Sequence, residues 1–189
     1  KRAGMPIYQL LGGKCREAAA VYSHADGGTN EEIEDSVRAL MAQGYRYIRT
    51  QASGYGGRAS RIPKPDGAVE GSYFDPREYV RRTLSAFEHV RNTVGEDIEL
   101  MHDIHERLRP IEAVGFAKDM EQFKLFFLED PLAPEDNAWF RHIRQTCTTP
   151  IAMGELFNNP GEWLPLIQDR LIDFLRVHIS QMGGITPAR

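Results

Sequence analysis

The sequence predicts an α/β fold built on a parallel sheet, and two observations support that prediction. Short runs rich in β-branched and aromatic residues alternate with longer amphipathic segments along the whole chain, which is typical of successive βα units. Hydrophobic residues make up 41% and charged residues 26% of the 189 residues, so the chain can bury one sizeable core. Six strands are expected, at residues 20–24, 45–51, 98–105, 124–129, 151–155 and 173–179.

The first two long helices carry clear start and stop signals. Thr29 lies three residues before Glu32, which is the spacing of a capping box, and the following apolar residues keep helical spacing until Gly44. Asp75 is the expected N-cap of the next helix, which continues to Gly95. Each of these helices follows a predicted strand and therefore completes a βα unit.

Proline residues open three further helices, expected at residues 110–120, 134–147 and 160–169. Pro165 lies inside the last of them and predicts that this helix is short or kinked. Before the first strand, residues 4–20 predict a short helix followed by a turn at Gly12 and Gly13.

Residues 52–74 form a long connection between the second strand and the second helix. Five glycines and two prolines fall in this stretch, which is longer than an ordinary βα connection. We interpret it as a lid or substrate loop, and a surface excursion without function is the alternative.

Composition and charge argue against several classes of protein. The formal net charge of −4 excludes a nucleic-acid binder that works by bulk basicity. No apolar run approaches the roughly eighteen residues that a membrane helix needs, and the first six residues lack the apolar block of a secretory signal. Cys15 and Cys147 form neither a CxxC pair nor a disulfide framework, which fits a reducing compartment. We therefore expect a cytoplasmic protein that binds neither nucleic acid nor membranes.

Three predicted strands run directly into a carboxylate: Asp103, Glu129 and Glu155. Successive members are 26 residues apart, which is one βα unit, so we expect them at the same height at the carboxyl edge of the sheet. Three crowded carboxylates repel one another unless a cation compensates them, and oxygen ligands suit Mg²⁺. Only the nearby histidines argue for zinc. The alternative is that each acid caps a helix or pairs with an arginine.

Side-chain alternation adds further polar groups to this edge. Asp103 and His105 are expected on one side of their strand and His102 on the other, against the helices. His105 is therefore the better catalytic candidate. Together with the three acids, these cationic and polar side chains would suit an anionic, polyhydroxylated substrate; the remaining members of the predicted ring are His24, Arg49, Gln51, Arg176 and His178.

Several motifs resemble one family closely: "KRAGMPIYQLLGGK", "RTQ", "HDIHERLRPIEA", "FLEDPLAPE", "PIAMGELF" and "LRVHISQMGGIT". They are similar to the mannonate dehydratase subgroup of the enolase superfamily, also called the D-galactonate dehydratase or starvation-sensing-protein-like family. The resemblance implies an enolase-type (β/α)-barrel, present here as a fragment with about six of the barrel strands and no N-terminal capping domain. Residues 1–19 would then be a lead-in from that cap, and residues 20–189 a partial catalytic barrel. We expect a parent polypeptide about twice as long, and no activity from this chain alone.

The resemblance also implies roles for the site residues. Asp103, Glu129 and Glu155 resemble the Mg²⁺ ligands, and His105 is similar to the general acid that protonates a departing 3-hydroxyl. Arg49 resembles the arginine that works with a loop tyrosine as general base, with Tyr55 as the nearest match to that tyrosine. The implied substrate-contacting set is His24, Gln51, Arg176 and His178.

The reaction implied is removal of water from an aldonate, D-mannonate or D-gluconate, to give a 2-keto-3-deoxy acid. Family members commonly form homo-oligomers. The glycine-rich stretch between Arg49 and Tyr55 is short for an efficient mannonate dehydratase, which keeps open a low-activity relative with a binding or regulatory role. A metal-free, doubly wound binding domain is a third possibility, although residues 24–28 lack the GxGxxG spacing of a phosphate-binding turn.

Overall fold

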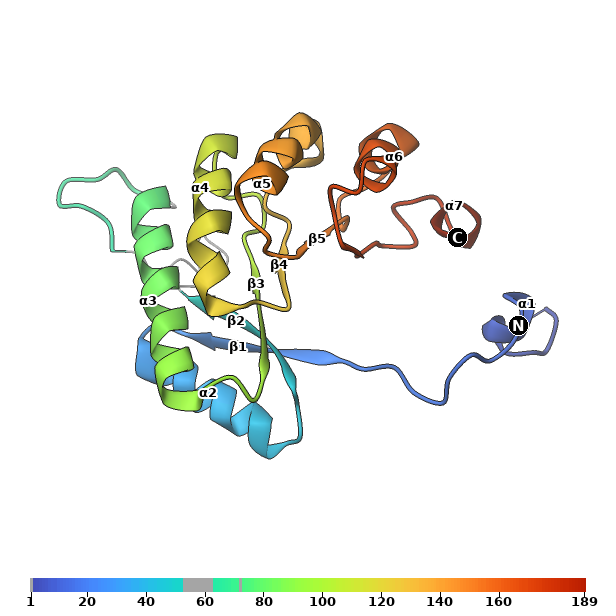
Figure 1. The fold of residues 1–189 in the computed structure, drawn as a ribbon, viewed down its shortest axis with the longest axis horizontal. Coiled ribbons are helices and arrows are strands. Elements are labelled where there is room, and N and C mark those ends of the chain that lie inside the picture. Colours follow the sequence, from blue (N-terminus) through green and yellow to red (C-terminus); the bar gives the residue numbers. More distant parts are fainter. Residues whose placement is uncertain (1, 53–62, 72) are drawn as a thin grey trace.

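The computed structural model describes residues 2–52, 63–71 and 73–189, and its central element is a six-stranded sheet. The strands follow one another in sequence order, and every neighbouring pair is parallel. Helices follow each other along one face of the sheet, whereas α1 (Ile7–Leu10) lies well away from it (Figure 1). The strands are β1 (Tyr22–Gly27), β2 (Tyr47–Ala52), β3 (Glu99–Asp103), β4 (Phe127–Glu129), β5 (Ile151–Met153) and β6 (Phe174–Leu175).

The helices begin where the sequence signals place them. The Thr29 hydroxyl accepts the Glu32 N–H at the start of α2 (Asn30–Ala42), and Asp75 caps α3 (Pro76–Val94) by accepting the N–H groups of Arg77 and Glu78. Further along the chain are α4 (Pro110–Met120), the 3-10 helix η2 (Glu121–Phe123), α6 (Pro160–Gln168) and α7 (Ile185–Ala188).

Some predicted boundaries are wrong. The single helix expected at 134–147 is instead a 3-10 helix, η3 (Pro134–Trp139), followed by α5 (Phe140–Thr146), and η3 is itself kinked at Asp136, which leaves helical geometry. Strand β1 continues to Gly27, so His24 lies within the strand and not at its end. Strands β3, β5 and β6 end earlier than predicted, which leaves His105, Glu155, Arg176 and His178 in the connections that follow them.

Strand alternation separates an apolar face from a polar one. Ile48, Leu100 and Leu128 point toward the helices and are completely buried in the main core. The other face carries a smaller apolar cluster that includes Met101 and Phe127. Polar side chains on this face lie closer to the carboxyl ends of the strands. On this second face, the charged side chains of Arg49, Asp103 and Glu129 therefore lie beyond the apolar cluster, toward the carboxyl ends of the strands.

His102 packs against the helices, as its position in the strand predicts. Its Nδ1 lies 2.9 Å from the carbonyl oxygen of Thr50, and its Nε2 lies 2.6 Å from the Tyr79 hydroxyl. A carbonyl only accepts hydrogen bonds, so Nδ1 carries the proton and Nε2 accepts from the tyrosine. Complete burial lowers the pKa of His102 to about 3. Among the described residues, no helix is both long and apolar enough to cross a bilayer.

Candidate metal and acid–base site

The candidate site lies at the carboxyl ends of β2 to β5. Asp103 and Glu129 pair directly across β3 and β4, so these two carboxylates end neighbouring strands at one height, as predicted. The equal sequence spacing is misleading for the next pair, because Glu129 pairs with Ala152. Glu155 therefore follows its strand by two residues and comes to the site from a loop, not from the strand itself.

Arg49 links the first two carboxylates. Its Nη1 lies 3.1 Å from Asp103 Oδ2 and 3.1 Å from Glu129 Oε2, and all three side chains are almost completely buried. Gln51, from the same strand, donates from Nε2 to the Asp103 carbonyl oxygen at 3.0 Å. Strand β2 thus supplies both a positive charge and a hydrogen bond that fixes the end of β3.

Arg176 forms ion pairs with both Glu129 and Glu155. Arg176 Nε lies 2.7 Å from Glu129 Oε1, and its Nη1 pairs with Glu155 Oε2. Burial works against the charge of this guanidinium, but Glu129, Tyr22 and Glu155 outweigh it and raise the pKa of Arg176. Arg176 therefore remains a permanent cation at the centre of the site.

Two histidines also lie beside Glu155. His105 Nε2 is 3.6 Å from Glu155 Oε1, and His178 Nε2 is 4.0 Å from Glu155 Oε2. The strand argument that placed His105 does not apply, since β3 ends at Asp103 and His105 adopts a left-handed backbone with φ of 57°. The turn after the strand, and not the strand itself, brings its ring to the acids.

His24 is an exposed member of the predicted set. It pairs with Arg49 across β1 and β2 and shares its face of the sheet, but its side chain is exposed. Partial burial and the positive charge of Arg49 lower the pKa of His24. Tyr55, the predicted partner of Arg49, lies outside the described residues.

Asp130 is a member of this site that the sequence prediction missed. Ligand oxygens of Glu129, Asp130 and Glu155 all lie within 4.8 Å of one another. Strand alternation predicts that Asp130 points away from Glu129, but its φ of 41° turns it back toward the site. The sequence signal was the acidic pair Glu129-Asp130 followed by a proline, which ends the strand abruptly.

Burial and the repulsion between neighbouring carboxylates raise the pKa values of two acids in the site. Burial, reinforced by Glu129, raises the pKa of Asp103 to about 6. Burial, reinforced by Asp103 and Glu129, raises the pKa of Asp130 to about 8. Among the described residues, Asp103 Oδ1 and Asp130 Oδ2 are buried without a hydrogen-bond partner. Buried carboxylate oxygens of this kind suit a hard divalent cation, which would offset the repulsion. Among the described residues, the ligand oxygens close enough to share one cation are those of Glu129, Asp130 and Glu155, a group that does not include Asp103.

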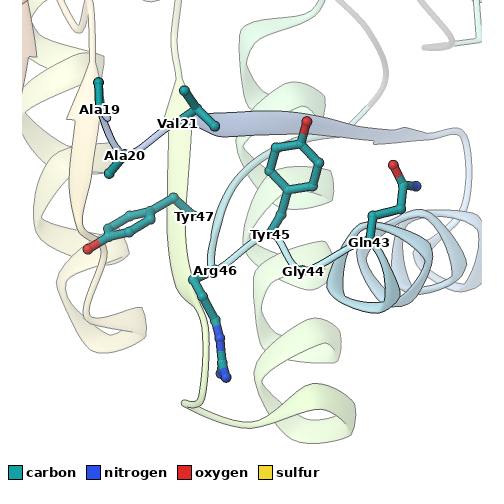
Figure 2. Close-up of a pocket in the computed structure, with 8 residues that line it drawn as sticks. All are labelled: Ala19, Ala20, Val21, Gln43, Gly44, Tyr45, Arg46 and Tyr47. Carbon is teal, nitrogen blue, oxygen red and sulfur yellow. The ribbon is translucent and has the colours of Figure 1, made fainter. Parts of the chain in front are cut away.

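A pocket of about 530 Å³ lies elsewhere, at the amino ends of β1 and β2. Figure 2 shows that the side chains of Tyr45, Arg46 and Tyr47 point in different directions around it, so no set of polar groups converges there. Size alone does not make this pocket the functional site, because acids, arginines and histidines gather at the opposite ends of the strands.

Comparison with known protein families agrees with this architecture. The model of the enolase C-terminal domain-like family matches residues 32–189. The chain belongs to this family. The predicted fold, an enolase-type barrel represented by six parallel strands, is thereby confirmed.

Two curated relatives and one solved structure are similar to this chain in sequence or in fold. It is 50% identical to the D-galactonate dehydratase family member RspA of Pantoea ananatis and 41% identical to a D-mannonate dehydratase of Caulobacter sp. strain K31, covering 100% of this chain and 49% of each relative. A crystal structure of an enolase from Pantoea ananatis, with bound D-gluconate and Mg, matches 99% of this chain and 49% of its own, with 48% identity and a TM-score of 0.90. The chain thus spans about half the length of the curated relatives it matches.

Proposed function

We propose that the chain carries the Mg²⁺ and acid–base residues of an acid-sugar dehydratase that acts on an aldonate. The observation that carries this proposal is the convergence of Glu129 and Glu155 on Arg176, with Arg49 joining Asp103 to the same group. Relatives named as dehydratases, and the gluconate and Mg of the similar solved structure, support the reaction class and the metal.

Asp103, Glu129 and Glu155 are the proposed Mg²⁺ ligands. Asp103 and Glu129 are almost completely buried, and the guanidinium groups of Arg49 and Arg176 balance the charges of the three carboxylates. A bound cation would share these carboxylates with the two arginines. When bound, Mg²⁺ would supply the positive charge that stabilises an aldonate carboxylate as its C2 proton leaves. The resemblance and the position of the charges support these roles.

The proton transfers are assigned to residues of this chain. Arg49, held by two carboxylates, would stabilise the phenolate form of Tyr55, whose hydroxyl is a poor base at its unperturbed pKa of about 10. His105, whose side chain is 39% exposed, would donate a proton to the departing 3-hydroxyl. Gln51, His24, Arg176 and His178 would contact the carboxylate and hydroxyls of the substrate.

The test is turnover by the full-length polypeptide. D-Mannonate, D-gluconate and D-galactonate would each be incubated with enzyme and Mg²⁺, and the 2-keto-3-deoxy acid would be measured. We expect product from at least one of them, loss of that product in Glu129→Gln, and none of this loss in the control Asp119→Asn on the exposed side of α4. Absence of turnover on every aldonate would favour a relative with a binding or regulatory role instead.

Location and assembly belong to the same proposal. From the resemblance to the dehydratase family, we propose a cytoplasmic homo-oligomer that acts on a small acid sugar. Light scattering of the full-length polypeptide would measure its oligomeric state directly, and a monomeric mass would contradict this part.

A further inference from the structure

We propose that Asp130 is a positioning residue for Glu155, with its carboxylate holding the loop that brings Glu155 to the site. This inference rests on the proposed role of Glu155 as a metal ligand. The supporting contact is a hydrogen bond in which the Gly154 N–H donates to Asp130 Oδ1 at 3.2 Å. Gly154 directly precedes Glu155, so the contact fixes the Met153–Gly154 peptide group immediately before the ligand residue.

The backbone of Asp130 is held from both sides. Its N–H donates to the carbonyl oxygen of Ala152 at 3.0 Å, and its own carbonyl oxygen accepts from the Glu106 N–H at 3.0 Å. With its backbone fixed and the residue only 1% exposed, Asp130 offers Gly154 a rigid acceptor. A loop bound to such an acceptor has little freedom to carry Glu155 away.

The backbone conformation at Gly154, which donates this hydrogen bond, favours glycine. Its φ is +135°, a conformation that side chains rarely adopt, and a Cβ added to it would lie 2.6 Å from the Arg176 carbonyl oxygen. The side chain of the same residue, Arg176, pairs with Glu129 and Glu155. The Asp130–Gly154 contact therefore sits at the junction of the β4, β5 and β6 loops.

Asp130 could instead be a ligand, because its oxygens lie close to those of Glu129 and Glu155. Its Oδ1 is already committed to the Gly154 N–H, and the two roles predict different behaviour for asparagine. An asparagine oxygen can still accept from Gly154, whereas a neutral amide is a much poorer metal ligand than a carboxylate.

The experiment compares Asp130→Asn with Asp130→Gly in the full-length polypeptide. Glycine removes the side chain without penalising the left-handed backbone at φ of 41°. The matched control is Arg170→Gly, which makes the same replacement at an exposed left-handed residue with φ of 53°. Amide hydrogen exchange of residues 153–157 is measured without metal, and the Mg²⁺ dissociation constant is measured by calorimetry.

We expect Asp130→Gly to speed exchange of the Gly154 amide by roughly tenfold or more and to weaken Mg²⁺ binding by about 10- to 100-fold. Asp130→Asn should stay within about threefold of the wild type in both measurements, and Arg170→Gly should match the wild type. Equal exchange in Asp130→Gly and the wild type would overturn the proposal. So would an Asp130→Asn variant that binds Mg²⁺ as weakly as Glu129→Gln, because that result makes Asp130 a ligand.

Neither measurement requires turnover. A polypeptide that dehydrates no aldonate would refute the proposed function but would leave the exchange and metal-binding results able to decide the role of Asp130. Where turnover is found, a positioning role predicts that Asp130→Gly lowers kcat by about 10- to 100-fold and that saturating Mg²⁺ restores part of it.

Discussion

Four glycines allow the steric and conformational costs of a single methyl group to be measured separately. Gly154 combines a φ of +135° with a Cβ position 2.6 Å from the Arg176 carbonyl oxygen. Gly44 has a φ of +94° and open space, Gly27 has ordinary φ but a Cβ position 2.6 Å from Ile33 N, and Gly115 has neither problem. Alanine at Gly154 therefore tests backbone strain and steric overlap together, and alanine at Gly44 tests strain alone. Alanine at Gly27 tests overlap alone, and alanine at Gly115 tests neither.

The expected changes in the free energy of unfolding follow from these geometries. Gly115→Ala, inside α4, should stabilise the protein by about 0.5–1 kcal/mol. Gly44→Ala should destabilise it by about 1–2 kcal/mol through backbone strain. Gly27→Ala should cost about 1–3 kcal/mol because the backbone of α2 must move. Gly154→Ala should cost roughly 3–5 kcal/mol, since both effects act at once.

Urea unfolding followed by tryptophan fluorescence measures all four. Trp163 is suited to this because its ring lies 6.1 Å from that of Phe157, whose side chain meets the Cβ position at Gly154. The measurement is made without divalent metal, so that ligand binding does not add to stability. If Gly154→Ala costs no more than Gly44→Ala, the close approach of Arg176 is not a constraint and the reasoning is refuted.

Three further outcomes are expected. Burial lowers the pKa of His102 from 6.5 to about 3, so the unfolded chain takes up a proton first and the protein loses stability as the pH falls below about 6.5. The difference in unfolding free energy between wild type and His102→Gln should change by up to about 1.4 kcal/mol per pH unit in this range, and a difference that does not vary with pH would contradict this. The pKa of Asp130 is raised to about 8, so ionisation of this carboxyl destabilises the folded state as the pH rises from about 4 to 8. Asp130→Asn should therefore raise the melting temperature of the metal-free protein at pH 8 but not at pH 4, and equal changes in melting temperature at both pH values would argue against this. In thermal unfolding, Mg²⁺ at 100 times its dissociation constant should stabilise the wild type by about 2.7 kcal/mol and leave the stability of Glu129→Gln unchanged. Equal stabilisation of both proteins would exclude Glu129 as a ligand.

The sequence predicts the strand order of this fold well because each βα unit carries its own signals. Capping residues such as Thr29 and Asp75 mark where helices begin, and the buried runs between them mark the strands. Strand ends were harder to predict, since apolar residues continue beyond the last ladder hydrogen bond. Residues 173–179 contain a strand of only two residues, and nothing in their composition reveals this.

The candidate site was predictable to the extent that strand pairing controls it. Asp103 and Glu129 follow from pairing, and Arg49 follows from alternation on the neighbouring strand. Asp130 could not be predicted in this way, because a left-handed residue reverses the direction that alternation assigns to it. His105 was correctly placed near the acids for an incorrect reason, since a turn of the same kind positions it.

The sequential order of the six parallel strands has an evolutionary consequence. Each βα unit delivers its own polar group to the shared edge, from Arg49 on β2 to Glu129 on β4, and the connection behind it runs over the outside of the sheet. A connecting loop can therefore lengthen, shorten or change its chemistry without altering the groups that its neighbours supply. New substrate preferences can arise through individual loops while the carboxylates at the strand ends, Asp103 and Glu129, stay in place.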